Sequence, residues 1–372
     1  MRFGLLQEAE TEMGSTHHFR YRELVREVQR AEEMGFDYWG TSEQHFVSPL
    51  ATVTAPEVLY GAVAAQTHRI NIRHMVTLLP FAFNHPLRVA ERIATLDIVS
   101  DGRAQLGCGR ANHLWQLDAF GIKATDTRPQ MLEAMEIIDK ALVQDEFEHH
   151  GPLLEIPKRR LSPRPVQHPR PPMFVIATSV ESHQVAGERG HGVISCDNWR
   201  GWDHLAEQAE IYRAAIATAK PANGVLNDSL GCCALTGYCA ETWEEAAEVA
   251  GPIAFSFLND VLEYLYLPLA NASKDYDYFK KISTDLADLR HTGDAKALND
   301  RTPTVILGTP EQLIEKIKKL ERLGYDEVVM RIDGMGHQKL MKSLELIGKY
   351  VIPEFNRPNS VVRALSIPGR VA

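Results

Sequence analysis

Short apolar runs alternate with longer segments in which apolar residues recur every three or four positions. In the first long segment, residues 21–34, Leu24, Val28 and Ala31 lie at helical spacing, and Gly35 follows. The short runs, which predict buried strands, cover residues 2–6, 36–42, 70–79, 104–107, 173–177, 193–196, 229–239 and 327–332. The periodic segments, which predict helices, cover residues 21–34, 56–67, 86–100, 129–144, 180–189, 202–219, 242–250 and 338–350. Eight strand–helix units in this order favour an α/β fold of the (β/α)8 TIM barrel type over an open doubly wound sheet.

Two segments interrupt the alternation. Residues 152–172 are rich in proline, which resists helix and favours extended chain. We interpret them as an insertion across the barrel surface rather than as a domain linker, because the alternation resumes afterwards. Residues 252–303 mix aromatic and charged side chains between the seventh and eighth strands, and segments of this length are often functional. We therefore expect one barrel domain, residues 1–372, with a 252–303 insertion that acts as a lid.

Composition excludes several classes of partner. The net charge is −9 and no long basic patch occurs, so nucleic acid and anionic membrane surfaces are not expected partners. No apolar run of 18 residues occurs, and the first residues lack the apolar region of a signal peptide, so we expect a cytoplasmic protein. The five cysteines show no CxxC spacing, which favours reduced core residues over a metal site.

Polar residues follow the predicted strands at the positions that form the mouth of such a barrel. The clearest cluster, residues 41–46, contains Glu43, Gln44 and His45. Residues after the strands of a (β/α)8 barrel surround its active site, so these three side chains are the candidate catalytic groups. Further candidates near the mouth are His85, His113, Trp199 and Arg331.

Five segments in order carry a resemblance to a known family. They are MRFGLL, YWGTSEQHF, HMVTLLP with the NHP that follows, SDGRAQLGCGR, and VILGTPEQL. Together they resemble the bacterial luciferase family of flavin-dependent monooxygenases. The resemblance implies a luciferase-like barrel that binds reduced FMN, which a separate flavin reductase supplies. It further implies a flavin hydroperoxide, formed with O2, that oxidises a small organic substrate.

The same resemblance assigns cofactor-binding residues. Arg110, Thr178, Ser179 and Ser182 fall on its phosphate site, where a cation and hydroxyl groups meet the start of a helix. Counting back from Pro80 places a non-prolyl cis peptide bond, which supports the flavin ring in this family, at Met75 and Val76. Two alternatives to direct binding stay open: Ser179 as a plain helix cap, and Arg110 in a surface ion pair.

The catalytic cluster departs from the luciferases proper, which carry two adjacent histidines there. Gln44 occupies the first position, and glutamine can hydrogen-bond but cannot transfer a proton. His45 is therefore the candidate acid/base, with a purely structural histidine as the alternative. Gly109 occupies the place of the luciferases' reactive cysteine, and strand alternation turns Cys108 the other way.

Other functions and an assembly state also follow from the resemblance. A deazaflavin-dependent oxidoreductase of the same superfamily and a non-catalytic flavin-binding barrel are the rival functions. The predicted helix over residues 56–67 has apolar residues around much of its surface, which favours a partner. With the resemblance, this predicts a homodimer packed through the helices at 56–67 and 86–100.

Overall fold

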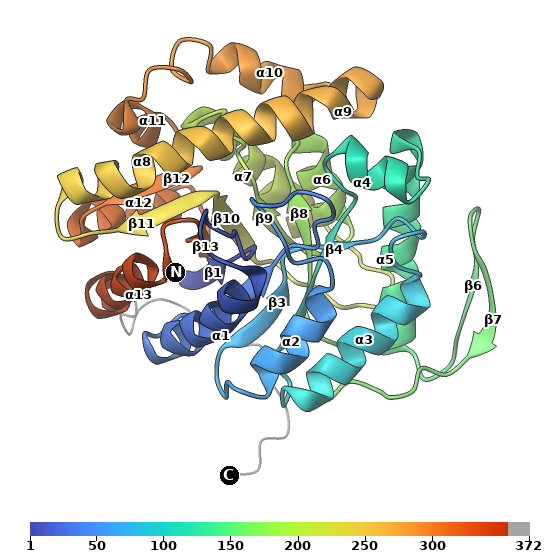
Figure 1. Cartoon of the computed structure of the whole chain (residues 1–372). Helices are drawn as coiled ribbons and strands as arrows, with labels where there is room; N and C mark the ends of the chain where they lie inside the picture. Colours follow the sequence, from blue (N-terminus) through green and yellow to red (C-terminus); the bar gives the residue numbers. More distant parts are fainter. Residues whose placement is uncertain (356–372) are drawn as a thin grey trace.

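The computed structural model describes residues 1–355 and forms a closed parallel barrel surrounded by helices (Figure 1). The barrel strands are β1 (Arg2–Leu6), β2 (Tyr38–Thr41), β3 (Asn71–His74) continued by β4 (Thr77–Leu78), β5 (Ala104–Gly109), β8 (Met173–Ala177), β9 (Gly192–Ser195), β10 (Leu230–Ala234) and β13 (Glu327–Arg331). They pair in the order β3-β2-β1-β13-β10-β9-β8-β5, and pairing of β3 with β5 closes the ring. The predicted eight-stranded barrel is therefore confirmed, although residues 356–372 of the predicted domain lie outside the described part.

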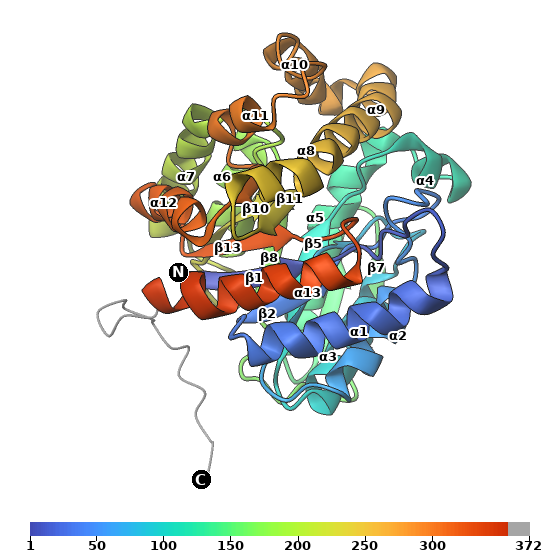
Figure 2. The ribbon, with the colours of Figure 1, turned by 60° about the vertical axis from the view of Figure 1, so that its left-hand side comes forward.

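Eight main helices cover the outside of the barrel. They are α1 (His17–Glu33), α2 (Pro56–Ala64), α3 (Pro86–Val99), α5 (Thr127–Val143), α6 (Val180–Glu188), α7 (Trp202–Ala217), α12 (Pro310–Arg322) and α13 (His337–Leu346). Helix α1 begins four residues before the predicted start because Thr16 caps it, accepting a hydrogen bond from Phe19 N. Figure 2 shows α1 and α13 lying side by side on the outside of the barrel. No helix of residues 1–355 is long and apolar enough to cross a membrane.

A buried arginine fills the barrel interior toward the N-terminal ends of the strands. The Arg73 guanidinium lies between the rings of Tyr38 and Phe174, 3.7 Å and 3.8 Å from their centroids. It also forms an ion pair of 2.5 Å with Glu327, which begins β13. Because these groups fill the interior toward the N-terminal ends of the strands, open space is left at the C-terminal ends.

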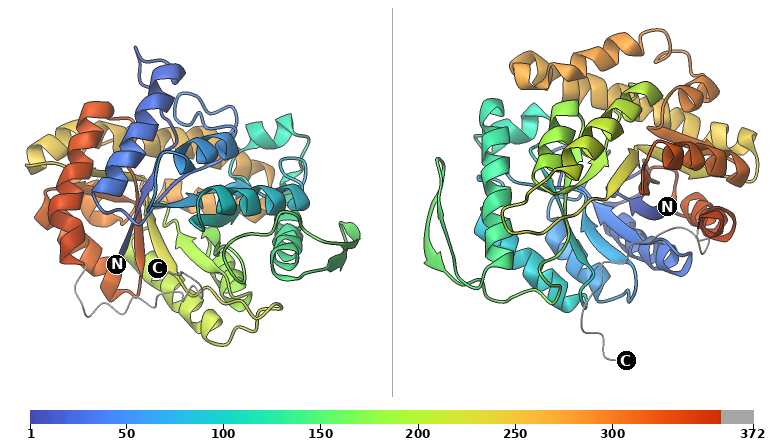
Figure 3. Two further views of the ribbon diagram at one scale, coloured as in Figure 1. Left: turned by 90° about the horizontal axis from the view of Figure 1, so that it is seen from below. Right: turned by 180° about the vertical axis from the view of Figure 1, so that it is seen from behind.

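The proline-rich insertion begins with an antiparallel hairpin of β6 (Phe147–His150) and β7 (Glu155–Arg159). The hairpin stands away from the barrel, beside α5 (Figure 3). Extended chain was predicted here from residue 152, whereas the hairpin starts at residue 147.

Residues 252–303 are mostly helical. Helix α8 (Trp243–Asp260) continues through Pro252, and a π-helix (Val261–Tyr266), α9 (Leu267–Ala272), α10 (Tyr278–Asp285) and α11 (Ala295–Arg301) follow. The predicted seventh strand divides at Leu235, because β11 (Thr236–Cys239) leaves the barrel and pairs with β12 (Val305–Gly308). This small two-stranded sheet holds both ends of the helical segment at one edge of the barrel (Figure 1).

Candidate functional site

A cavity of about 1250 Å³, including its open mouth, lies at the C-terminal ends of the barrel strands. Its floor and walls come from residues on seven barrel strands or the loops directly after them. The wall residues include Leu6, Glu8, Ser42, Gln44, Met75, Val76, Gly109, Arg110, Val175, Thr178, Cys196, Asn198, Cys233 and Leu235. The helical segment adds Phe257, Val261, Leu265, Tyr266, Tyr278 and Phe279 as a cover. The predicted lid residues are thus part of the cavity wall.

One end of the cavity is cationic. Arg110, at the end of β5, donates from Nη2 to the Asp275 carbonyl at 3.2 Å, and its guanidinium lies 4.0 Å from the Tyr276 ring centroid. Its Nη1 is buried and has no hydrogen-bond partner. A smaller adjoining cavity of about 360 Å³ is lined by Arg110, Arg128 and Arg189 together. Within residues 1–355 Arg128 pairs with Glu181 at 3.0 Å, whereas Arg110 forms no ion pair, and its buried unpaired N–H favours an anionic ligand.

Hydroxyl groups face this cationic end from the start of α6. Ser179 caps α6 and accepts from Ser182 N at 3.3 Å, and the two hydroxyl oxygens lie 2.9 Å apart. Thr178 donates to the Tyr278 hydroxyl at 2.9 Å. Thr178 and Ser182 line the cavity, whereas Ser179 does not. The structure therefore brings three of the four predicted phosphate residues to the cavity wall, with Ser179 supporting them as a cap.

Met75 and Val76 form an apolar shelf where the third strand divides into β3 and β4. Two glycines leave the space that these side chains occupy. A Cβ on Gly40 would lie only 2.4 Å from Met75 Cγ, and a Cβ on Gly109 would lie only 2.5 Å from Val76 Cγ2. All cis peptide bonds within residues 1–355 precede proline, so the cis bond predicted at Met75–Val76 is wrong for this structure. The loop after β2 accommodates the trans bond, since Met75 N donates to the Thr41 carbonyl and Glu43 N to the Val76 carbonyl.

The three catalytic candidates after β2 are placed differently. Gln44 lines the cavity, and its Oε1 is buried without a partner. Glu43 is buried behind the wall, where it accepts from Leu78 N at 2.9 Å and from Asn84 Nδ2. His45 also lies behind the wall, with Nε2 3.3 Å from Glu43 Oε1. Its ring stacks on Phe83, at 5.7 Å between centroids and 3° between planes. Only Gln44 of the three reaches the cavity.

The remaining candidate residues near the barrel mouth cap helices, pack in the core or form ion pairs. His85 and His113 cap α3 and the short helix α4 (Leu114–Ala119), and burial lowers the pKa of His113 to about 4. Trp199 is buried beside Phe257. Arg331 pairs with Glu8 at 2.8 Å and Glu10 at 2.6 Å. None of these four candidates lines the cavity.

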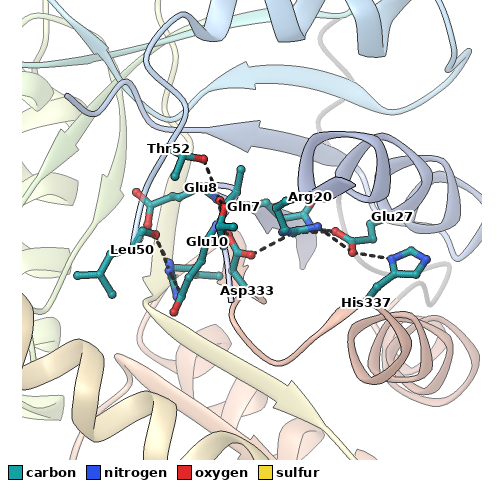
Figure 4. A network of polar contacts seen from close by, with 12 residues as sticks. Gln7, Glu8, Glu10, Arg20, Glu27, Leu50, Thr52, Asp333 and His337 are labelled. Carbon is teal, nitrogen blue, oxygen red and sulfur yellow. Dashed lines mark hydrogen bonds and ion pairs between the residues drawn. The ribbon is translucent and has the colours of Figure 1, made fainter. Parts of the chain in front are cut away.

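The sequence reasoning missed Glu8, whose carboxylate lines the cavity and accepts from Ser42 and Arg331. The loop that carries Glu8 is fixed by Asp333, which accepts from Glu8 N at 2.7 Å and from Glu10 N at 3.1 Å. Figure 4 shows this network continuing through Arg20 to Glu27 and His337. Glu8 follows β1 by two residues, so the strand-end rule applied to β1 would have found it.

Two asparagines were also missed. Asn112 Oδ1 and Asn198 Nδ2 are buried without a partner, and both residues line the cavity. Asn198 is 2% exposed and has φ +52°. Its loop is fixed by Asp197, which accepts from Gly201 N and from the Thr302 and Thr304 hydroxyls. Unpaired polar atoms at a cavity wall indicate a ligand with its own hydrogen-bonding groups.

These features fit a flavin mononucleotide. Arg110, Thr178 and Ser182 match a phosphate, and the Met75–Val76 shelf offers an apolar surface for a flat ring. The unpaired atoms of Gln44, Asn112 and Asn198 could pair with polar groups on the ring system or on a second molecule.

Comparisons with known protein sequences identify related proteins along most of the chain. The luciferase-like monooxygenase family profile matches residues 1–327. The oxygenase component of the flavin-dependent trigonelline monooxygenase of Acinetobacter baylyi is 25% identical over 374 residues, covering 96% of each chain. Limonene 1,2-monooxygenase of Rhodococcus erythropolis is 26% identical over 364 residues, covering 92% of this chain and 83% of that protein.

Solved structures share the fold. One is the oxygenating constituent of the 3,6-diketocamphane monooxygenase of Pseudomonas putida, a type II Baeyer–Villiger monooxygenase in complex with FMN. It matches with a TM-score of 0.73 and 22% identity, over 95% of this chain and 98% of its own. An F420-dependent secondary alcohol dehydrogenase matches with a TM-score of 0.68 and 15% identity, over 94% and 98% of the two chains. With a family match over most of its length and a closed barrel of the same architecture, the chain belongs to the luciferase-like monooxygenase family of flavin-dependent oxidoreductases.

Proposed function

We propose that this protein is the oxygenase component of a two-component FMN monooxygenase. It would take reduced FMN from a separate reductase and use O2 to oxidise a small organic substrate. The observation that carries the proposal is the buried, unpartnered Nη1 of Arg110 at the cationic end of a cavity that also contains Thr178 and Ser182. A phosphate monoester is the ligand chemistry that this end accommodates best.

The protein would hold the cofactor at two places. Arg110 would bind the phosphate. The Thr178 and Ser182 hydroxyls, which pair with Tyr278 and Ser179 in this structure, would turn to donate to it, and the Ser179 cap would keep the start of α6 in place. Met75 and Val76 would support the ring from below. Reduced FMN, when bound, supplies the electrons that activate O2. The mostly apolar wall excludes water from that chemistry.

For the catalytic groups, the geometry supports Gln44 as the side chain that contacts the ring or the substrate. Glu43 and His45 would act one layer behind it. Glu43 ties the loop to β4 and Asn84, and His45 fills the space between Glu43 and the Phe83 and Phe120 rings. The assignment gives His45 a positioning role in oxygenation.

The substrate would be small and largely apolar. The wall away from Arg110 is formed by Leu6, Leu235, Phe257, Val261 and Leu265, and such surface favours apolar molecules. Glu8 and Asn198 are the polar groups that would orient it.

A deazaflavin-dependent oxidoreductase is the second candidate function, because one structural neighbour uses F420. The two functions differ in their reaction with oxygen. Anaerobic protein with reduced FMN should, on mixing with O2, give flavin oxidation kinetics and a hydrogen peroxide yield that differ from those of free reduced FMN. Identical behaviour with and without protein would remove the monooxygenase proposal.

We also propose a homodimer through α2. Val58 is 72% exposed there, and with Ala62 it lines an open groove toward Tyr21 and Val25 of α1. Exposed apolar surface of this kind favours a second apolar surface over water. Analytical sedimentation at micromolar protein concentration measures the oligomeric state. A dimer is expected, and a monomer would contradict the proposal.

A further inference from the structure

Two cysteines lie side by side on neighbouring strands of the barrel. In the parallel pairing of β9 and β10, Cys232 is in register with Ser195, so the next residues, Cys233 and Cys196, are neighbours. Both line the cavity, with 3% and 7% of their surfaces exposed. Cys232 belongs instead to the fully buried core outside the barrel interior, because side chains alternate along a strand.

The two thiols lie on the same face of the sheet and influence each other. The neighbouring Cys196, together with burial, raises the pKa of Cys233 well above its ordinary value. Both cysteines are free. Neighbouring strands lie roughly 4.8 Å apart, within the range of roughly 4.4–6.8 Å between Cα atoms that a disulfide spans. The pair therefore needs no large backbone movement to become cross-linked.

We propose that Cys196 and Cys233 form a peroxide-oxidisable dithiol, a disulfide site in the wall of the cavity. Hydrogen peroxide accepts two electrons from the first thiol, giving a sulfenic acid and water. The second thiol then attacks that sulfur, an S–S bond forms, and the hydroxyl leaves with the thiol proton as a second water. Overall, two thiols and one peroxide give one disulfide and two waters.

The order of the two thiols follows from their surroundings. Cys196 is the more exposed of the pair, so it is the thiol that peroxide reaches first. Cys233, the more buried of the two, is then the resolving thiol, and it attacks as the thiolate once its proton has been lost. Both sulfurs face the space in which O2 would react with reduced flavin.

The biological part of the inference rests on the proposed function. When no substrate is bound, reduced flavin and O2 release hydrogen peroxide inside the cavity. Oxidation of the pair would fasten β9 to β10 beside Leu235 and Phe257 and so change the substrate end of the cavity. Unproductive turnover would in this way produce a reversible change in the enzyme itself.

The test uses the full chain, without flavin, treated with equimolar hydrogen peroxide. The protein is then unfolded, alkylated and weighed. The expected result is loss of two of the five thiols, a mass decrease of about 2 Da before alkylation, and recovery of all five with dithiothreitol. Cys196→Ser and Cys233→Ser should each abolish the disulfide. Cys232→Ser, the matched control one residue away, should leave it intact.

Peptide mapping supplies a second readout if a variant does not fold. Cys196 lies on its own tryptic peptide, while Cys232, Cys233 and Cys239 share another. Only a cross-link between these two peptides in the parent protein agrees with the proposal. No thiol loss, a cross-link that survives in Cys233→Ser, or one that disappears in Cys232→Ser would overturn it.

A parallel titration with reduced FMN separates the two proposals. A disulfide that forms in a protein with no FMN affinity would uphold the dithiol and remove the proposed function. FMN binding without a disulfide would do the reverse.

Discussion

The guanidinium of Arg110 lies 4.0 Å from the ring centroid of Tyr276, so the end of β5 is joined directly to the helical segment that covers the cavity. The Asp275 carbonyl accepts from the same guanidinium, and Thr178 reaches Tyr278 two residues farther on. The side chains proposed to bind the phosphate are thus the ones that hold the cover. Loading of the cofactor and movement of the cover should therefore be coupled.

Replacing Arg110 should weaken cofactor binding. Arg110→Ala removes a charge-assisted contact and should weaken reduced FMN binding by about 1.5–3 kcal/mol, roughly 10- to 150-fold in Kd. An anaerobic titration measures this. Arg159→Ala, on the exposed strand β7, is the control and should bind like the parent. Equal affinity of the parent and Arg110→Ala would remove this residue from the phosphate site.

The cover should respond to the cofactor. Residues 269–303 join short helices through turns, and their contacts with the barrel include Arg110 and Thr178. Limited proteolysis should cut this segment before other parts of the chain, and FMN should protect it by fixing Arg110. Tyr276→Ala should increase the cutting rate without FMN. Cutting that is equally fast with and without FMN would argue against a lid.

Loss of His45 should uncouple the reaction rather than prevent binding. The residue packs between Glu43 and two phenylalanine rings behind Gln44, so His45→Ala loosens the loop and leaves the phosphate site intact. FMN affinity should stay within about threefold, while product per O2 falls and hydrogen peroxide rises. Gln44→Ala should reproduce this pattern. His85→Ala, an exposed helix cap, should not. Full coupling in His45→Ala would show that the loop does not depend on it.

Stability should fall at mildly acidic pH because of buried neutral histidines. His74 stacks on Tyr60 and hydrogen-bonds Thr77, and burial lowers its pKa to about 3. The unfolded chain binds this proton below about pH 6.5 and the folded chain does not. Stability is therefore complete above pH 6.5 and decreases as pH falls toward 3. Between pH 7 and 5 this histidine should cost about 2 kcal/mol.

Urea unfolding at the two pH values measures that difference. His74→Asn should reduce it, while His150→Asn, on the exposed hairpin, should leave it unchanged. An unchanged pH dependence in His74→Asn would show that other groups cause the loss.

The sequence was sufficient for the barrel because each strand and helix has its own local signal. Strands β1 and β8 match their predicted bounds, and Thr309 caps α12 with Gln312 in a reciprocal pair. The second half of α8 and the helices after it were not recognised as helical, since Pro252 reads as a helix end although α8 continues through it. Residues 229–239 were predicted as one strand, because no residue in this range signals that the chain leaves the barrel sheet at Leu235 and joins a second sheet.

The candidate site was predictable only in part. Positions after strands locate Gln44, Arg110 and Thr178 at the mouth, and all three line the cavity. The direction of a loop side chain depends on contacts with distant residues. His45 turns away because Glu43, Phe83 and Phe120 hold it, and Asn198 turns inward because Asp197 fixes its loop to Thr302 and Thr304. Such pairings across the fold leave no periodic pattern in the sequence.

Whether the cavity binds reduced FMN through Arg110 can be measured by anaerobic titration of the full chain with reduced FMN and with reduced F420. We expect saturable binding of reduced FMN, with F420 weaker by about tenfold or more and with the preference lost in Arg110→Ala. Tighter binding of F420, or no saturable binding of either cofactor, would contradict this expectation.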